Sequence, residues 1–178
     1  MKTFTNGFLF FFAIFLTLFF LCTSFFVTVQ ITDGQQFSHL ADSFLQGRVD
    51  FLSVVDNHHD TVFFDNKHFW PLGPFPAVLL IPFVWITGIF NIFFYQGYVL
   101  VPIALITFWV IFRIARRIGF SPQDSFFWTY AFGFGSVYIA ALFLSHSWYF
   151  SHSIVVLLLF LALHEYLYKK RFWLIGGF

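Results

Sequence analysis

Residues 31–69 read ITDGQQFSHLADSFLQGRVDFLSVVDNHHDTVFFDNKHF, and the rest of the chain is organised around this polar segment. Six of the eight acidic residues and four of the seven histidines lie inside it. The sequence on either side is apolar. We therefore expect any chemistry that the chain performs to take place in this segment.

The composition is that of a membrane protein. Of the 178 residues, 60% are hydrophobic and only 10% are charged, and the mean hydropathy is +0.82. Soluble domains carry about 25% charged residues. The net charge of +1 and the lack of a basic tract give no ground for a nucleic-acid partner. We predict an all-α integral membrane protein, with residues 1–178 forming a single membrane domain.

The first apolar run, Gly7 to Val29, predicts a transmembrane helix. It contains no charged residue and exceeds the ~20 residues that cross a bilayer core. A cleaved signal peptide is the alternative, but its apolar region would be ~7–15 residues long and would end in an Ala-x-Ala-like site, which this run lacks. Lys2 places the amino terminus in the cytoplasm, and the loop 31–73 then lies on the outer face of the cell membrane.

A short amphipathic helix is expected next. Asp33 would cap its start and Gly47 would end it. Its apolar residues recur at helical spacing, and its other face is polar. The apolar set is Phe37, Leu40, Ala41, Phe44 and Leu45, and the polar set is Gln36, His39, Asp42, Ser43 and Gln46. We expect this helix to lie along the membrane surface, followed by an irregular loop over residues 49–67.

Charge placement decides how the uncharged residues 69–112 cross the membrane. The basic clusters at 113–117 and 169–171 favour the cytoplasmic side. One crossing, by residues 97–112, puts the first cluster inside, whereas two crossings would put it outside. Residues 74–95, which contain three prolines, are therefore predicted to lie in the outer interface, or as a re-entrant hairpin packed on protein.

Two further crossings are predicted, by residues 125–144 and 154–168. The total is about four transmembrane helices, with the start of a fifth at 173–177. The turn between the last two crossings, residues 145–153, would face the same side as residues 31–69. Two polar patches would then converge on one membrane face.

Asp33 is the candidate catalytic residue, because it follows directly on a membrane span. It is either a helix cap, or a general base or metal ligand at the lipid headgroup level. Lys67 and His68 could hold a lipid phosphate at the membrane surface, or they could anchor the interface beside Trp70. His152, together with His146, could complete the site from the second patch, or it could end a helix in water.

The run His58-His59-Asp60 invites a metal-binding interpretation. Adjacent residues of an extended chain point to opposite faces, so these side chains cannot readily coordinate one metal ion together. No His-x-x-x-His or Cys-x-x-Cys spacing is present to support zinc. We identify no metal ligands, and whether the protein uses a divalent cation stays open.

The order of these features resembles the amino-terminal part of the GT-C type polytopic membrane glycosyltransferases, which include the protein O-mannosyltransferases and the aminoarabinose transferases. Three motifs carry the resemblance. They are Asp33-Gly34 after the first span, the surface helix QFxxLAxxFLxG at 36–47, and KHFWPLGPFP at 67–76. The family implies a large first outer loop with juxtamembrane helices, which agrees with the non-spanning assignment of residues 74–95.

The resemblance also implies a reaction. The donor is a polyprenyl-phosphate sugar, and a hydroxyl of a lipid, glycan or protein acceptor attacks the anomeric carbon with inversion. Asp33 would orient or deprotonate the acceptor. Lys67 or His68 would stabilise the charge on the leaving phosphate. His152 is a further candidate, as an accessory residue.

The chain departs from the family in three respects. Many protein mannosyltransferases have Asp-Glu in place of Asp33-Gly34, and many relatives have an acidic residue where this chain has His152. Such enzymes also have many more spans, so the chain is expected to be a fragment of a larger transferase and inactive alone. Two alternatives stay open: a small membrane carrier or flippase component, and a non-catalytic membrane subunit. A carrier would place ionisable residues within its spans, whereas here the acidity lies outside them.

Overall fold

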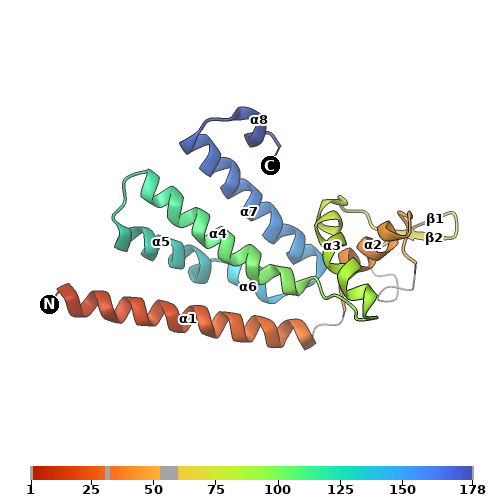
Figure 1. The fold of residues 1–178 in the computed structure, drawn as a ribbon, viewed down its shortest axis with the longest axis horizontal. Coiled ribbons are helices and arrows are strands. Elements are labelled where there is room, and N and C mark those ends of the chain that lie inside the picture. The colour runs from red at the N-terminus through yellow and green to blue at the C-terminus, as the bar shows by residue number, and fades with distance from the viewer. Residues whose placement is uncertain (1, 31–32, 53–59, 178) are drawn as a thin grey trace.

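The computed structural model describes residues 2–30, 33–52 and 60–177 (Figure 1). The described part is mostly helical. Its elements are α1 (Lys2–Gln30), α2 (Gln36–Leu45), β1 (Val62–Phe64), β2 (Lys67–Phe69), α3 (Phe75–Ile89), α4 (Gly97–Arg117), α5 (Pro122–Gly135), α6 (Tyr138–Phe143), α7 (Ser147–Tyr168) and α8 (Phe172–Ile175).

Three of these helices are long and apolar enough to cross a membrane. The candidate spans are Phe10–Thr28 in α1, Gly97–Arg117 in α4 and Ser147–Tyr168 in α7. They confirm that long apolar helices occupy the crossings predicted at residues 7–29, 97–112 and 154–168. The residues predicted to begin a fifth span form only the four-residue helix α8.

The span predicted at residues 125–144 is not one continuous helix. Ser136 adopts an extended conformation (φ −122°, ψ 173°) and separates α5 from α6. Its Oγ accepts a hydrogen bond from the backbone N–H of Tyr138, the first residue of α6, at 3.2 Å. Gly133 allows α5 to approach α4 closely, because a Cβ there would overlap the ring of Phe108. Each piece is shorter than the ~20 residues needed to cross a bilayer, but together they lead back along α4 (Figure 1).

Helices α2 and α3 and the hairpin β1–β2 gather at the end of the molecule where α1 ends and α7 begins (Figure 1). Helix α3 has 15 residues and contains Pro82. It is therefore shorter than a membrane span, as expected for a segment that was predicted not to cross.

The predicted cap and faces of α2 need correction. The helix begins at Gln36 with Gln35 as its N-cap, so the prediction that Asp33 caps it is wrong. The predicted end is confirmed, because the helix stops at Leu45 and Gly47 follows with a φ of 72°. The predicted polar face is only partly exposed: Gln36 and Ser43 are buried. This is because α2 packs against α3 instead of lying alone on a surface.

Residues 60–70 form a hairpin where an irregular loop was predicted. Strands β1 and β2 pair antiparallel, with Val62 opposite Phe69 and Phe64 opposite Lys67. Asp65 and Asn66 connect them with φ values of 50° and 56°, as a two-residue type I′ turn requires. Asp56, His58 and His59 lie outside the described residues.

Aromatic side chains hold the elements of this end together. Phe37 of α2 is fully buried. Its ring lies 5.6 Å from the ring of Trp70 and 6.0 Å from that of Phe150 in α7. Such contacts contribute about 0.5–1.5 kcal/mol each beyond the burial of their area. They fix α2, the end of the hairpin and the start of α7 relative to one another.

Candidate functional site

The Asp33-Gly34 segment and the start of α7 meet in the structure, as predicted for the two polar patches. The backbone N–H and the Oγ of Ser147 both lie within hydrogen-bond distance of the carbonyl oxygen of Gly34, at 2.9 and 2.8 Å. The Oγ also lies 2.7 Å from Oε1 of Gln36. The predicted turn over residues 145–153 is wrong for most of its length, because Ser147 already begins α7. We call residues 33–36, 60–70 and 145–148 the polar end.

Gln96 joins these segments and was missed by the sequence reasoning. Its side chain is fully buried. Nε2 donates to the carbonyl oxygens of Gly34 at 2.9 Å and Ser145 at 2.6 Å. Its backbone N–H donates to Oε1 of Gln35 at 3.0 Å. The one signal in the sequence is an amide side chain directly before the apolar helix α4, inside a run that contains no charged residue.

Gly34 cannot be replaced by a larger residue without movement of its surroundings. Its φ is 71°, which disfavours residues with a Cβ. A Cβ at this position would also overlap Nδ1 of His146. The glycine of the Asp33-Gly34 pair is thus required both by its backbone conformation and by its close contact with the second polar patch.

Asp33 is exposed beside this fixed glycine. Its backbone carbonyl accepts a long hydrogen bond, 3.5 Å, from Nε2 of Gln35. Because α2 begins three residues later, the carboxylate does not cap that helix. The structure therefore places an exposed carboxylate on a backbone that buried hydrogen bonds hold in position.

The hairpin that carries Lys67 and His68 is attached to α7. Nε1 of Trp148 donates to Oδ2 of Asp60 at 2.9 Å. Within the hairpin, Oγ1 of Thr61 lies 2.9 Å from Nδ1 of His68. Lys67 is exposed and His68 is half-buried. Both predicted phosphate-binding residues therefore belong to the polar end.

An ion pair holds the chain between α2 and the hairpin. Arg48 contacts both carboxylate oxygens of Asp50, with Nε 3.2 Å from Oδ1 and a second, shorter contact to Oδ2. These hydrogen bonds lower the pKa of Asp50 below its ordinary value, and the positive charge of Lys67 acts in the same direction. Asp50 is a loop carboxylate, as expected, but it is buried and paired.

His152 lies on α7, exposed, one helical turn beyond Trp148. Residues four apart share a helix face, so His152 is on the face that carries the contact to the hairpin. Among the described residues, no group of three His, Cys, Asp or Glu side chains could hold a metal ion. All four candidate site residues (Asp33, Lys67, His68 and His152) thus lie on elements of the polar end or directly beside them.

Comparisons with protein-family models, with curated proteins and with solved structures find no match for this chain.

Proposed function

We propose that the polar end is the site of sugar transfer from a polyprenyl-phosphate donor to a hydroxyl acceptor, with inversion, at the outer face of the cell membrane. The observation that carries this proposal is the placement of Asp33. Its carboxylate is exposed next to a glycine that Gln96 and Ser147 hold by buried hydrogen bonds. A general base needs such a fixed position beside its substrate.

Each of the other candidate residues has a role in this proposal. Lys67 would bind the donor phosphate and stabilise the charge that develops on it. His68 is the alternative candidate for this role, because neighbouring residues of the strand β2 point to opposite faces, and His152 would assist from α7. A divalent cation stays open as a cofactor.

The proposal includes a topology with four crossings. They are made by α1, α4, the pair α5–α6 and α7, with the amino terminus in the cytoplasm. Helix α3 would lie in the outer interface, since its exposed side chains include Trp85, Ile86 and Ile89, and tryptophan favours this position. The polar end would then lie at the level of lipid phosphates.

A carrier or a non-catalytic subunit has less support. Within the three candidate spans, Asp, Glu, Lys and Arg side chains occur only in the last turn or two of α4 and α7. A transport pathway would place such groups deeper in the membrane.

Asp33→Asn tests the catalytic role. The substitution keeps the shape of the side chain but removes its basicity, so we expect sugar transfer to fall by about 10²- to 10⁴-fold, the usual contribution of a general base. The measurement is transfer of a radiolabelled sugar from polyprenyl phosphate by membranes that contain the protein.

Asp42→Asn is the matched control, because Asp42 is an exposed carboxylate on α2 and has no role in the proposal. It should leave the rate unchanged. If Asp33→Asn retains full activity while the protein inserts normally, Asp33 is not the base and the proposal fails.

A further inference from the structure

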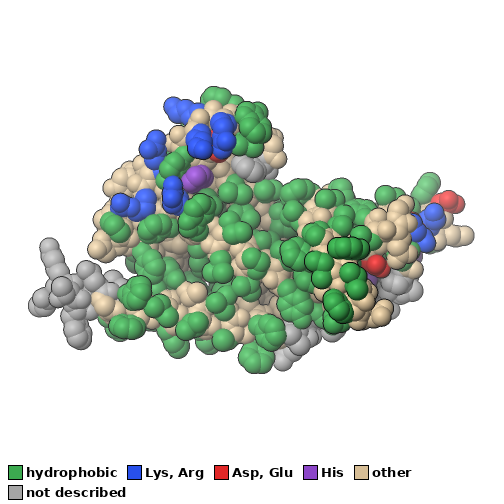
Figure 2. All heavy atoms as spheres, in the orientation of Figure 1, with side chains coloured by type: hydrophobic (Ala, Val, Ile, Leu, Met, Phe, Trp, Pro, Cys, Tyr) green, Lys and Arg blue, Asp and Glu red, His purple; other side chains and the backbone are tan. Residues whose placement is uncertain are grey.

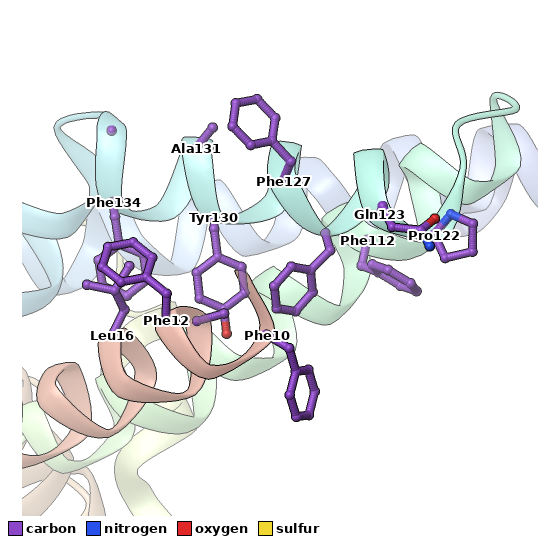
Figure 3. Close-up of a pocket in the computed structure, with 13 residues that line it drawn as sticks. Phe10, Phe12, Leu16, Phe112, Pro122, Gln123, Phe127, Tyr130, Ala131 and Phe134 are labelled. Carbon is purple, nitrogen blue, oxygen red and sulfur yellow. The ribbon is translucent and has the colours of Figure 1, made fainter. Parts of the chain in front are cut away.

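A groove of about 720 Å³ lies between α1 and α5 (Figure 3). Its volume falls within the ~300–1,000 Å³ that is usual for ligand sites. The walls are almost entirely apolar and aromatic. They include Phe12 and Leu16 of α1 and Phe126, Phe127 and Phe134 of α5. The hydroxyl of Tyr130 also lines the groove, but it is already hydrogen-bonded to Oγ1 of Thr17 at 2.6 Å.

The dimensions of the groove suit one lipid chain. On α5 it extends from Pro122 to Gly135, which is about 20 Å of helix at ~1.5 Å per residue. The hydrocarbon of one leaflet is ~15 Å thick, half of a ~30 Å core. On α1 the groove lies along residues 10–16, the first part of the candidate span Phe10–Thr28, so its occupant would lie among lipid chains.

One end of the groove is polar and lies near a cationic side chain. Gln123 lines this end. Arg116 follows the lining residue Phe112 by one turn of α4, and residues four apart share a helix face. Nη1 of Arg116 donates to the carbonyl oxygen of Phe120 at 2.6 Å, two residues before the groove begins at Pro122. Arg116 is exposed, and its guanidinium has further N–H groups with which to bind an anion.

Arg116 belongs to a larger group of cations, which we call the basic end. Lysine and arginine side chains gather where α4 and α7 finish (Figure 2). The group comprises Arg113, Arg116, Arg117, Lys169, Lys170 and Arg171. Glu165 pairs with Arg171 through two hydrogen bonds of 2.7 and 2.8 Å and so balances one of these charges.

We propose that the groove binds an anionic phospholipid of the leaflet at the basic end. One acyl chain would lie between α1 and α5, and the phosphate would contact Arg116 and Gln123. The apolar wall selects a hydrocarbon chain and the cation at its mouth selects a negative headgroup. The site is independent of the proposed sugar transfer, which we place at the opposite end of the molecule.

The test is lipid retention by the purified full chain. The protein is equilibrated with phosphatidylglycerol or phosphatidylcholine of identical acyl chains, and bound lipid is counted by native mass spectrometry. We expect one retained phosphatidylglycerol, at least 5-fold more abundant than retained phosphatidylcholine. Equal retention of the two lipids would overturn the proposal.

Two variants locate the bound lipid. Gly135→Trp places an indole in the groove, where a Cβ meets nothing within 4 Å, and Arg116→Gln removes the charge at the mouth. Each should reduce retention of phosphatidylglycerol at least 5-fold. The controls are Gly88→Trp in α3, where a Cβ also meets nothing within 4 Å, and Lys170→Gln, which removes one charge from the basic end.

Unchanged retention in both groove variants contradicts the proposal, as does an equal loss in the controls. A dimer that dissociates in Gly135→Trp and retains no lipid would also contradict it, because a second copy of the chain would then fill the groove. Circular dichroism of every variant checks that the helices are intact.

Discussion

Gly34 is the residue at which the two halves of the polar end meet, and Gln96 holds it there. The Asp33-Gly34 pair could be recognised in the sequence, because it directly follows an apolar span. Its partners could not, because Gln96 and Ser147 lie 62 and 113 positions further along the chain. A local sequence pattern cannot predict a hydrogen bond between residues so far apart in the chain. The prediction that Asp33 caps α2 is wrong, because the N-cap of that helix is Gln35.

Gly34→Ala should destabilise the protein more than Gly47→Ala. Both glycines have φ values near 70°, so an alanine at either position destabilises the folded backbone by about 1 kcal/mol. Only Gly34 has a neighbour that a Cβ would overlap, which adds about 1–3 kcal/mol of overpacking. Chemical denaturation in detergent measures the difference. Adding His146→Ala should recover part of the loss in Gly34→Ala; equal costs at the two glycines would contradict the packing described.

Gln96→Leu should cost about 1–3 kcal/mol of stability, the usual penalty for a buried polar group left without its partner. The carbonyl oxygen of Ser145 loses the bond from Nε2, and that of Gly34 loses one of its donors. Gln46→Leu is the control, because Gln46 is exposed at the end of α2. The same denaturation measurement applies, and a control that costs as much as Gln96→Leu would show that the network contributes little.

At the scale of elements, the apolar periodicity predicted the helices well and their interruptions poorly. Residues 97–112 lie in one helix as expected, and that helix continues to Arg117. Residues 125–144 did not, because Ser136 adopts an extended backbone that no periodicity reveals. The hairpin was missed for a related reason. Its strands are only three residues long, and the Asp65-Asn66 turn was not recognised as a type I′ turn.

The Arg48–Asp50 pair should make the loop between α2 and the hairpin sensitive to acid. The pKa of Asp50 is lower in the folded protein than in the unfolded chain. Its contribution to stability is therefore fully present above the unfolded pKa of ~3.9 and is lost as pH falls through the lowered folded value. The difference in Tm between the protein and Asp50→Asn should be constant from about pH 5 to 7 and should shrink under stronger acid.

Asp42→Asn removes one exposed carboxylate from α2 and controls for the loss of charge alone. Thermal unfolding followed by intrinsic fluorescence gives both differences in Tm. A difference for Asp50→Asn that grows on acidification would contradict the assigned direction of the pKa shift.

The whole molecule has two chemically distinct ends, which the charge pattern of the sequence predicted. At the basic end, the hydroxyl of Tyr168 donates to the carbonyl of Arg113 at 3.0 Å and Nε of Arg117 donates to that of Leu167 at 3.1 Å. These bonds tie the last turns of α4 and α7 together. At the polar end, hydrogen bonds among Gly34, Gln96 and Ser147 tie the segment before α2 to the starts of α4 and α7. The groove between α1 and α5 could not be foreseen, since it depends on how far two helices diverge.

The central claim is that residues 74–95 do not cross the membrane, so that the polar end faces outward and the basic end inward. Cysteines at positions 95 and 120 test it, after Cys22→Ser removes the one native thiol. Intact cells are treated with a membrane-impermeant maleimide. We predict labelling of Tyr95→Cys from outside and protection of Phe120→Cys until the membrane is permeabilised. If residues 74–95 form a further span, the pattern reverses, and labelling at position 120 with protection at position 95 would contradict the account.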